Sequence, residues 1–213
     1  MVLKNQHSSL VIDTLHDGID RDGAAVAYVY CDFTTLYMQS TSAVLGSVLR
    51  RVVGAVEEIP DEVQQVFRRA KKQTDSCKLR LPEILDMLTK SLLRSKRGFI
   101  CIDAMDEFPA KQRAQLWKSL QRVVRGCPNT RLFLTGRPQI RTEVEDYLPG
   151  EAEMVAIEPT EEDITRYIEE RLKEDLDKST IDEGLREDIR NVIPKKVKGM
   201  YVLTIDVKFH KLG

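Results

Sequence analysis

Short apolar runs alternate with helix-like stretches along most of the chain. The apolar runs are bounded by polar residues or turn residues, a pattern typical of buried strands. They cover residues 24–31, 98–103, 131–135 and 154–157. Because helix-like stretches separate these runs, we expect an α/β fold with a doubly wound, mainly parallel sheet.

Between the strands, apolar residues recur at helical spacing. The predicted helices cover residues 8–16, 42–56, 81–93, 111–124, 161–175 and 182–192, and the polar stretch 58–77 is helical or partly loop. After residue 160 the pattern predicts helices only. Thr160 and Asp163 have the spacing of a capping box, with Asp in place of the usual Glu. We therefore expect a core of residues 1–158 and the start of a small helical extension at 159–213, with a boundary near Glu158 and Pro159.

Composition and charge exclude several classes of protein. The chain has 42% hydrophobic and 31% charged residues, as ordinary globular proteins do. With 33 basic and 34 acidic residues, the net charge is -1, so no global basic field attracts nucleic acid. No apolar stretch approaches the roughly 18 residues that span a bilayer, and the N-terminus lacks a signal-peptide core. We expect a cytoplasmic protein without a membrane segment.

The four cysteines agree with a reducing compartment. They are widely spaced, form no C-x-x-C pair and have no nearby histidine that would complete a zinc site. Cys31 and Cys101 lie in apolar strand-like runs, where a thiol usually serves as a small buried hydrophobe.

The strand at residues 98–103 carries the most specific chemical pattern. It ends at Asp103, which should lie at the carboxyl edge of the sheet, where open α/β sheets bind ligands. A carboxylate there suits Mg²⁺, and Asp106 or Glu107 could act on a water beside a phosphate. From the acids alone, a simple solvent-exposed loop is the favoured alternative.

A second apolar strand changes that preference. The run 131–135 ends in Thr135, Gly136 and Arg137, at what should be the same edge of the sheet. A guanidinium is planar, permanently charged and forked, and so suits a phosphate oxygen. Arg137 alone would be a surface or salt-bridge residue, but beside the acidic strand it becomes a candidate phosphate sensor.

These two strands resemble motifs of one ATPase class. Residues 99–107 resemble the Walker B segment of NACHT-type STAND ATPases, which are P-loop NTPases, and residues 132–138 resemble their sensor 1 strand. Four further segments resemble the fungal, NLR-like branch of this class, which has a nephrocystin-3-like N-terminal domain; they are residues 9–13, 25–32, 157–164 and 198–203. The resemblance spans about residues 8–204.

The resemblance implies roles for the candidate site residues. Asp103 would assist Mg²⁺, and Asp106 and Glu107 would act on the hydrolytic water. Arg137 would sense the γ-phosphate of ATP or GTP, with Thr135 beside it in the same cofactor-binding edge. The class hydrolyses nucleotide and signals through protein partners.

The phosphate-binding loop of that class is missing from the sequence. No G-x-x-x-x-G-K-[ST] motif occurs, although this pattern supplies the glycine cradle, the ammonium group and the Mg²⁺-binding hydroxyl. Gly18 and Gly23 have the right spacing, but Ala24 and Ala25 follow. By resemblance, residues 4–8 stand where the loop should end. We therefore expect a truncated or degenerate module that does not hydrolyse nucleotide alone.

Loss of the P-loop implies loss of the strand before it. In this class, by resemblance, the strand order is 5-1-4-3-2 and the first strand is central. Its loss would leave the strand 131–135 with an unpaired edge, which is costly when buried and adhesive when exposed. The sheet could close around the gap, another chain could supply a strand, or the fold could be marginally stable.

Three functions remain open at this point. The first is a fragment or degenerate NACHT module of a signalling switch. The second is an interaction module that binds itself or related NLR-like receptors. The third is an ATPase completed by a P-loop from upstream sequence or from another chain. The sequence does not identify the signal, the effector or the nucleotide.

Overall fold

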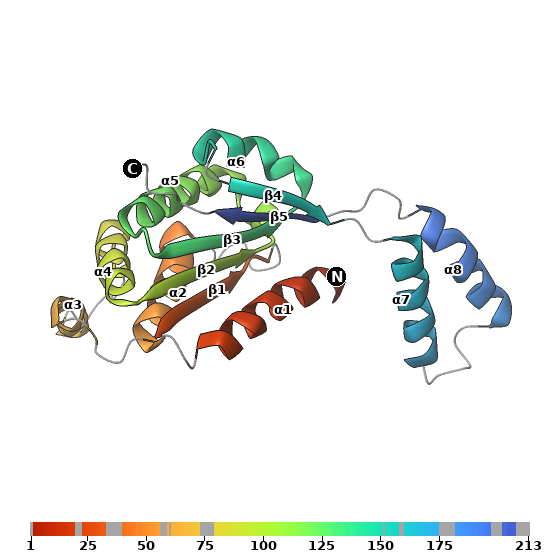
Figure 1. The fold of residues 1–213 in the computed structure, drawn as a ribbon, viewed down its shortest axis with the longest axis horizontal. Coiled ribbons are helices and arrows are strands. Elements are labelled where there is room, and N and C mark those ends of the chain that lie inside the picture. Colours follow the sequence, from red (N-terminus) through yellow and green to blue (C-terminus); the bar gives the residue numbers. More distant parts are fainter. Residues whose placement is uncertain are drawn as a thin grey trace. The chain divides into compact units, whose positions relative to one another are not determined.

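A computed structural model shows how the chain folds (Figure 1). The residues it describes are 2–19, 23–32, 40–55, 59, 61–72, 79–150, 152–157, 160–174, 182–196 and 202–207. The chain divides into two compact units, Met1–Val155 with Leu203–Gly213, and Ala156–Val202. The boundary expected near Glu158 and Pro159 falls outside the described residues.

The first unit is built on a mixed sheet with a parallel core. The strands are β1 (Ala24–Tyr30), β2 (Arg97–Asp103), β3 (Thr130–Gly136), β4 (Ala152–Ile157) and β5 (Val202–Val207). They are arranged in the order β1-β2-β3-β5-β4, and the pairs β1–β2 and β2–β3 are parallel. The predicted α/β fold with a parallel sheet is therefore confirmed.

Helices flank the parallel strands (Figure 1). They are α1 (Val2–Ile19), α2 (Thr41–Ala55), α3 (Asp61–Lys72), α4 (Leu81–Arg94), α5 (Ala110–Gly126) and α6 (Arg141–Tyr147), with 3₁₀ turns η2 (Met105–Glu107) and η3 (Pro138–Ile140). The predicted helices of this unit are present, and α6 is an addition that the pattern did not predict. None of the helices in the described ranges combines the length and the apolar character that a membrane crossing demands.

The main core lies on the sheet face covered by α2, α4 and α5. Alternate strand residues such as Ala27, Ile102 and Leu134 are buried there among apolar side chains of these helices. Residues of the other parity, such as Val26 and Cys101, are also buried but lie outside this cluster, on the face where α1 packs. Because both faces are covered, the parallel strands read as nearly continuous apolar runs.

Strand β5 corrects the prediction that only helices follow residue 160. It pairs antiparallel with β3, from Gly136 opposite Leu203 to Leu132 opposite Val207. The edge of β3 that we expected to be unpaired is thus covered by the chain's own C-terminal strand, inserted between β3 and β4. From Leu203 to Val207 apolar and polar residues alternate, which is a strand pattern too short to stand out beside the helices.

The second unit is a pair of helices, α7 (Glu161–Glu174) and α8 (Glu183–Lys196). Its small core combines Ile164, Ile168 and Leu172 with the partly buried Ile189. The predicted capping box at its start is confirmed: the backbone N–H of Asp163 donates to the Thr160 hydroxyl at 3.1 Å, and the backbone N–H of Thr160 donates to the Asp163 carboxylate at 3.1 Å.

Candidate functional site

The carboxyl ends of β2 and β3 bring Asp103 and Thr135 together. The strands are parallel and in register, with Ile102 opposite Leu134, so the next residue of each strand lies at the same edge. The Thr135 hydroxyl donates to Oδ1 of Asp103 at 2.5 Å, and each residue is only 4% exposed. A buried carboxylate needs such donors, because an ion removed from water without partners is very costly. The pair therefore joins the two strand ends.

Ala104 turns the chain away from β2 in a left-handed conformation. Its φ and ψ are 54° and 48°, a region that costs a non-glycine residue roughly 1–2 kcal/mol. Two hydrogen bonds hold it: its N–H donates to the Thr135 hydroxyl at 3.0 Å, and its carbonyl accepts from the Glu107 N–H at 2.8 Å. The tight turn swings η2 over the ends of the strands, so that the acids Asp106 and Glu107 follow Asp103 closely.

Asp106 connects η2 to the exit of β3. Its side chain is 2% exposed, and its Oδ1 accepts the backbone N–H of Arg137 at 3.1 Å. Its Oδ2 lies 3.4 Å from Nε of Arg137, whose side chain is 56% exposed. A Cβ on Gly136 would come within 3.3 Å of Oδ1 of Asp106 and 2.5 Å of Cδ1 of Ile140, so the close approach depends on glycine. The predicted acid and the predicted sensor arginine thus form one ion pair.

The remaining candidate acid, Glu107, is partly buried in η2 and contributes to the field around Cys31. The Cys31 N–H donates to the carbonyl of Asp103 at 2.9 Å, which places the thiol residue beside the acidic edge. Burial, followed by the charges of Asp103, Asp106 and Glu107, raises the pKa of Cys31 to about 12. The thiol therefore stays protonated at neutral pH and is no nucleophile there.

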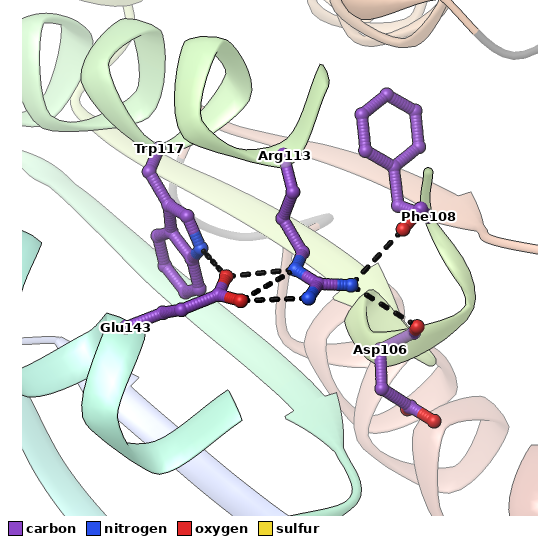
Figure 2. Close-up of polar contacts among 5 residues, drawn as sticks. All are labelled: Asp106, Phe108, Arg113, Trp117 and Glu143. Carbon is purple, nitrogen blue, oxygen red and sulfur yellow. Dashed lines mark hydrogen bonds and ion pairs between the residues drawn. The ribbon is translucent and has the colours of Figure 1, made fainter. Parts of the chain in front are cut away.

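A partly buried arginine, Arg113, holds the loop that carries the acids (Figure 2). Arg113, in the second turn of α5, donates through Nη1 to the backbone carbonyls of Asp106 at 3.2 Å and Phe108 at 3.1 Å. On its other side it forms a two-pronged ion pair with Glu143 of α6, with Nη2 2.6 Å from Oε1 and Nε 2.7 Å from Oε2. Figure 2 shows the Asp106 carboxylate pointing away from Arg113, so the arginine holds backbone and leaves the acid's own oxygens to Arg137.

Trp117 completes this clamp from the next turn of α5. Its indole Nε1 donates to Oε2 of Glu143 at 2.7 Å, and its ring stacks on Tyr147 at an interplanar angle of 8°. Trp117 is fully buried in the core. The sequence pattern had given no role to Arg113 or Glu143. The i, i+4 spacing of Arg113 and Trp117 was the available signal, since it puts both on one face of a helix.

The clamp predicts a pH-dependent stability. Partial burial of the Glu143 carboxyl acts to raise its pKa, but hydrogen bonds from Arg113 and Trp117 and the charge of Arg113 outweigh burial, so the pKa lies below its usual 4.5. A carboxylate with a depressed folded-state pKa stabilises the fold above its unfolded-state pKa, and this contribution is lost as the pH falls through the folded-state pKa. Glu143→Gln should therefore be less stable than the parent chain at neutral pH, and the gap should narrow below pH 4.5.

Urea unfolding from neutral pH to about pH 3 measures this gap. Glu145→Gln, on the same helix but in a largely exposed ion pair with Arg141, is the matched control and should show little change. A gap between parent and Glu143→Gln that stays constant across this pH range would contradict the proposed charge contribution.

The oxygens of the acids at this edge already have partners within the chain. One oxygen of Asp103 and both oxygens of Asp106 already accept hydrogen bonds or ion pairs from Thr135 and Arg137. Across the described ranges, no group of three or more His, Cys, Asp or Glu side chains is placed to hold a metal ion. Mg²⁺ sites with one or two carboxylates rely on substrate phosphates for further ligands, and the sequence lacks the loop that would hold those phosphates.

Comparison with known proteins identifies one family. A family model described as nephrocystin 3, N-terminal, matches residues 4–137, which is more than half of the chain. The matched region contains the acidic edge and Arg137 but ends before Glu143. Neither the curated proteins nor the solved structures gave a match.

Proposed function

Because the chain belongs to the nephrocystin 3 N-terminal family, we propose that it is a degenerate NACHT-type module of a STAND signalling protein that does not hydrolyse ATP or GTP alone. The observation that carries this proposal is that the acids at the carboxyl edge of the sheet already have partners within the chain. The oxygens of Asp106 are engaged by Arg137, and Asp103 is engaged by Thr135. Three residues to which the family resemblance assigns Mg²⁺, water and γ-phosphate, namely Asp103, Asp106 and Arg137, are thus each engaged by another residue of the chain.

The chemistry of phosphoryl transfer gives this observation its weight. Catalysis of that reaction is almost entirely positioning of the phosphates and stabilisation of their charge. An arginine paired with a buried aspartate is not available in that geometry to a phosphate, and the aspartate oxygens that it engages are not available to a water. In this proposal Asp103, Asp106, Thr135 and Arg137 hold the ends of β2 and β3 and the turn η2 in one rigid arrangement.

We expect the purified chain to show no saturable binding of ATP or GTP with Mg²⁺, and no phosphate release above that of a control protein. Calorimetric titration and a phosphate-release assay measure the two properties. Asp103→Asn is the matched control, because it keeps the shape and an oxygen that accepts from Thr135 while removing the charge. Saturable turnover that Asp103→Asn abolishes would show that the proposal is wrong.

A second candidate is a module that binds itself or a related receptor. It is favoured by a separate observation, the insertion of a C-terminal strand between β3 and β4 of the sheet. Binding of a related NLR-like receptor by the chain, with no nucleotide binding, would support it. Turnover that arises only after addition of a P-loop-bearing homologue would instead favour an ATPase completed by another chain.

We place the protein in the cytoplasm. Cys31, Cys101 and Cys127 are buried free thiols, and burial raises the pKa of Cys101 to about 12 and that of Cys127 to about 11. Thiols that remain buried and protonated suit a reducing compartment. Fractionation of cells that express the tagged chain tests this placement.

A further inference from the structure

Helix α5 lies in a stretch of sequence that has many bases and no acids. Residues 108–142 contain eight Lys or Arg residues and neither Asp nor Glu. The whole chain is nearly balanced, with 33 basic and 34 acidic residues, so this stretch is a local excess of positive charge. Five of its bases belong to α5; Arg113 turns inward to Glu143, and the other four are exposed.

The exposed bases of α5 form a line along the outer side of the helix. Lys111, Lys118 and Arg122 stand at positions i, i+7 and i+11, so an α-helix directs the second and third to within about 20° of the first. The line is roughly 16 Å long, because each helical residue adds about 1.5 Å. Arg125 continues the line but has a partner within the chain. We therefore define the basic stripe as Lys111, Lys118 and Arg122.

The charge of the basic stripe is not compensated within the fold, unlike that of other surface helices. Bases elsewhere pair with acids of their own helix, as in Lys90–Asp86 on α4, Arg141–Glu145 on α6 and Arg166–Asp163 on α7. Helix α5 has no acid, and among the described residues none forms an ion pair with the stripe. Lys118 and Arg122, one turn apart, repel each other, and Lys111 lies in the first turn, where the helix dipole disfavours a cation. Negative charge from a partner would relieve both effects.

The character of this face favours a protein helix as the partner. Of the exposed large apolar side chains in the described ranges, none is on α5, so the face has no side chain to enter a lipid surface. The aromatic residue of α5, Trp117, is buried and cannot stack on a nucleobase, and the net charge of -1 does not attract nucleic acid. A partner helix has the same rise per residue as α5, so carboxylates at its own positions i, i+7 and i+11 meet all three bases when the helices lie parallel.

We propose that the basic stripe of α5 is a docking site for an acidic α-helix of a protein partner, which presents carboxylates at positions i, i+7 and i+11. Each contact is an exposed ion pair and therefore weak, so the three together give a low affinity that falls as salt is added. The docking uses neither nucleotide nor the acids at the carboxyl edge of the sheet. Its failure would leave the nucleotide experiment untouched, and nucleotide turnover would leave the docking untouched.

Nuclear magnetic resonance titration of the isotope-labelled full chain tests the docking, because it detects weak binding and locates it. The probe is an alanine-rich helical peptide with Glu at i, i+7 and i+11, and the control peptide has the same three Glu residues spread around the helix. The aligned peptide should shift backbone signals of α5 saturably and bind roughly tenfold more tightly than the control peptide. Equal affinity for the two peptides would overturn the proposal.

Two triple variants separate the basic stripe from general charge attraction. The stripe variant combines Lys111→Gln, Lys118→Gln and Arg122→Gln, all at exposed positions. The matched control also removes one Arg and two Lys, from exposed positions of α8, by Arg190→Gln, Lys195→Gln and Lys196→Gln. The stripe variant should bind the aligned peptide roughly tenfold more weakly than the parent chain, and the control should bind it as the parent does. Equal losses in the two variants would contradict the assignment to α5.

A charge exchange gives a readout that misfolding could not produce. Lys118→Glu should lose affinity for the aligned peptide and regain it for a peptide with Lys in place of the middle Glu. No gain from the exchanged peptide would count against the proposed alignment. A short single-stranded DNA or phosphatidylserine vesicles that shift the same α5 signals at a lower concentration of charge would show that the class of partner is wrong.

Discussion

Replacing Trp117 with alanine is expected to lower the free energy of unfolding by about 4 kcal/mol, as large-to-small changes of a buried Trp do. The indole is fully buried in the main core and stacks on Tyr147 with ring centroids 6.2 Å apart. Its loss leaves a cavity under α6 and removes the Nε1 donor to Glu143. Urea unfolding followed by circular dichroism measures the change.

Two controls separate packing from hydrogen bonding at this position. Trp117→Phe keeps an aromatic ring in the core but removes the donor to Glu143, and should cost less, about 2 kcal/mol. Lys118→Ala changes the exposed neighbour and should stay within about 0.5 kcal/mol of the parent chain. If Trp117→Ala were no less stable than Trp117→Phe, the packing of the indole would not be the main contribution.

The strands and the acidic edge could be read from the sequence because they depend on local patterns. Runs such as residues 98–103 are apolar along their length since both faces of the parallel sheet are covered, and such runs stand out beside amphipathic helices. Once two strands are parallel neighbours, the residues at their carboxyl ends must meet. The contact of Asp103 with Thr135 follows from that rule, although the partners of each oxygen do not.

The clamp and the last strand could not be read in the same way, because they depend on distant segments. Helix α6 has seven residues, of which only Val144 is buried, so it has no apolar stripe from which a helix could be predicted. If α6 is not predicted, Glu143 cannot be placed beside α5. Arg113 is then interpreted as an exposed surface residue. Strand β5 pairs with β3, which lies 67 or more residues earlier in the chain (Gly136 is opposite Leu203, and 203 − 136 = 67). A local sequence pattern does not report such distant pairings.

The left-handed turn at Ala104 was also hidden from the sequence. A positive φ is usually predicted from a glycine, whereas the residue with a positive φ here is an alanine. What holds Ala104 there is the surrounding structure, above all the Thr135 hydroxyl on the neighbouring strand. The roles that the resemblance gives Asp106 and Arg137 likewise stay predictions, whereas their ion pair is a property of the fold.

Thr135→Val is expected to lower the free energy of unfolding by about 2–3 kcal/mol, because an isosteric side chain leaves two buried polar groups without this partner. The hydroxyl donates to Oδ1 of Asp103 at 2.5 Å and accepts the Ala104 N–H at 3.0 Å. Valine fills the same volume, so the loss comes from hydrogen bonding rather than from a cavity. Chemical unfolding of the variant and the parent chain at neutral pH gives the value.

Thr135→Ser supplies the decisive comparison, since it keeps the hydroxyl and removes one methyl group from a buried strand. Its expected cost is about 1 kcal/mol, less than that of valine, although serine has the lower strand propensity. If serine proved the more damaging change, packing rather than the hydroxyl would hold the edge together. A lower free energy of unfolding for Thr135→Val than for Thr135→Ser would show that the hydrogen bonds joining Asp103, Thr135 and Ala104 hold the strained turn. They would then also hold η2 over the ends of β2 and β3.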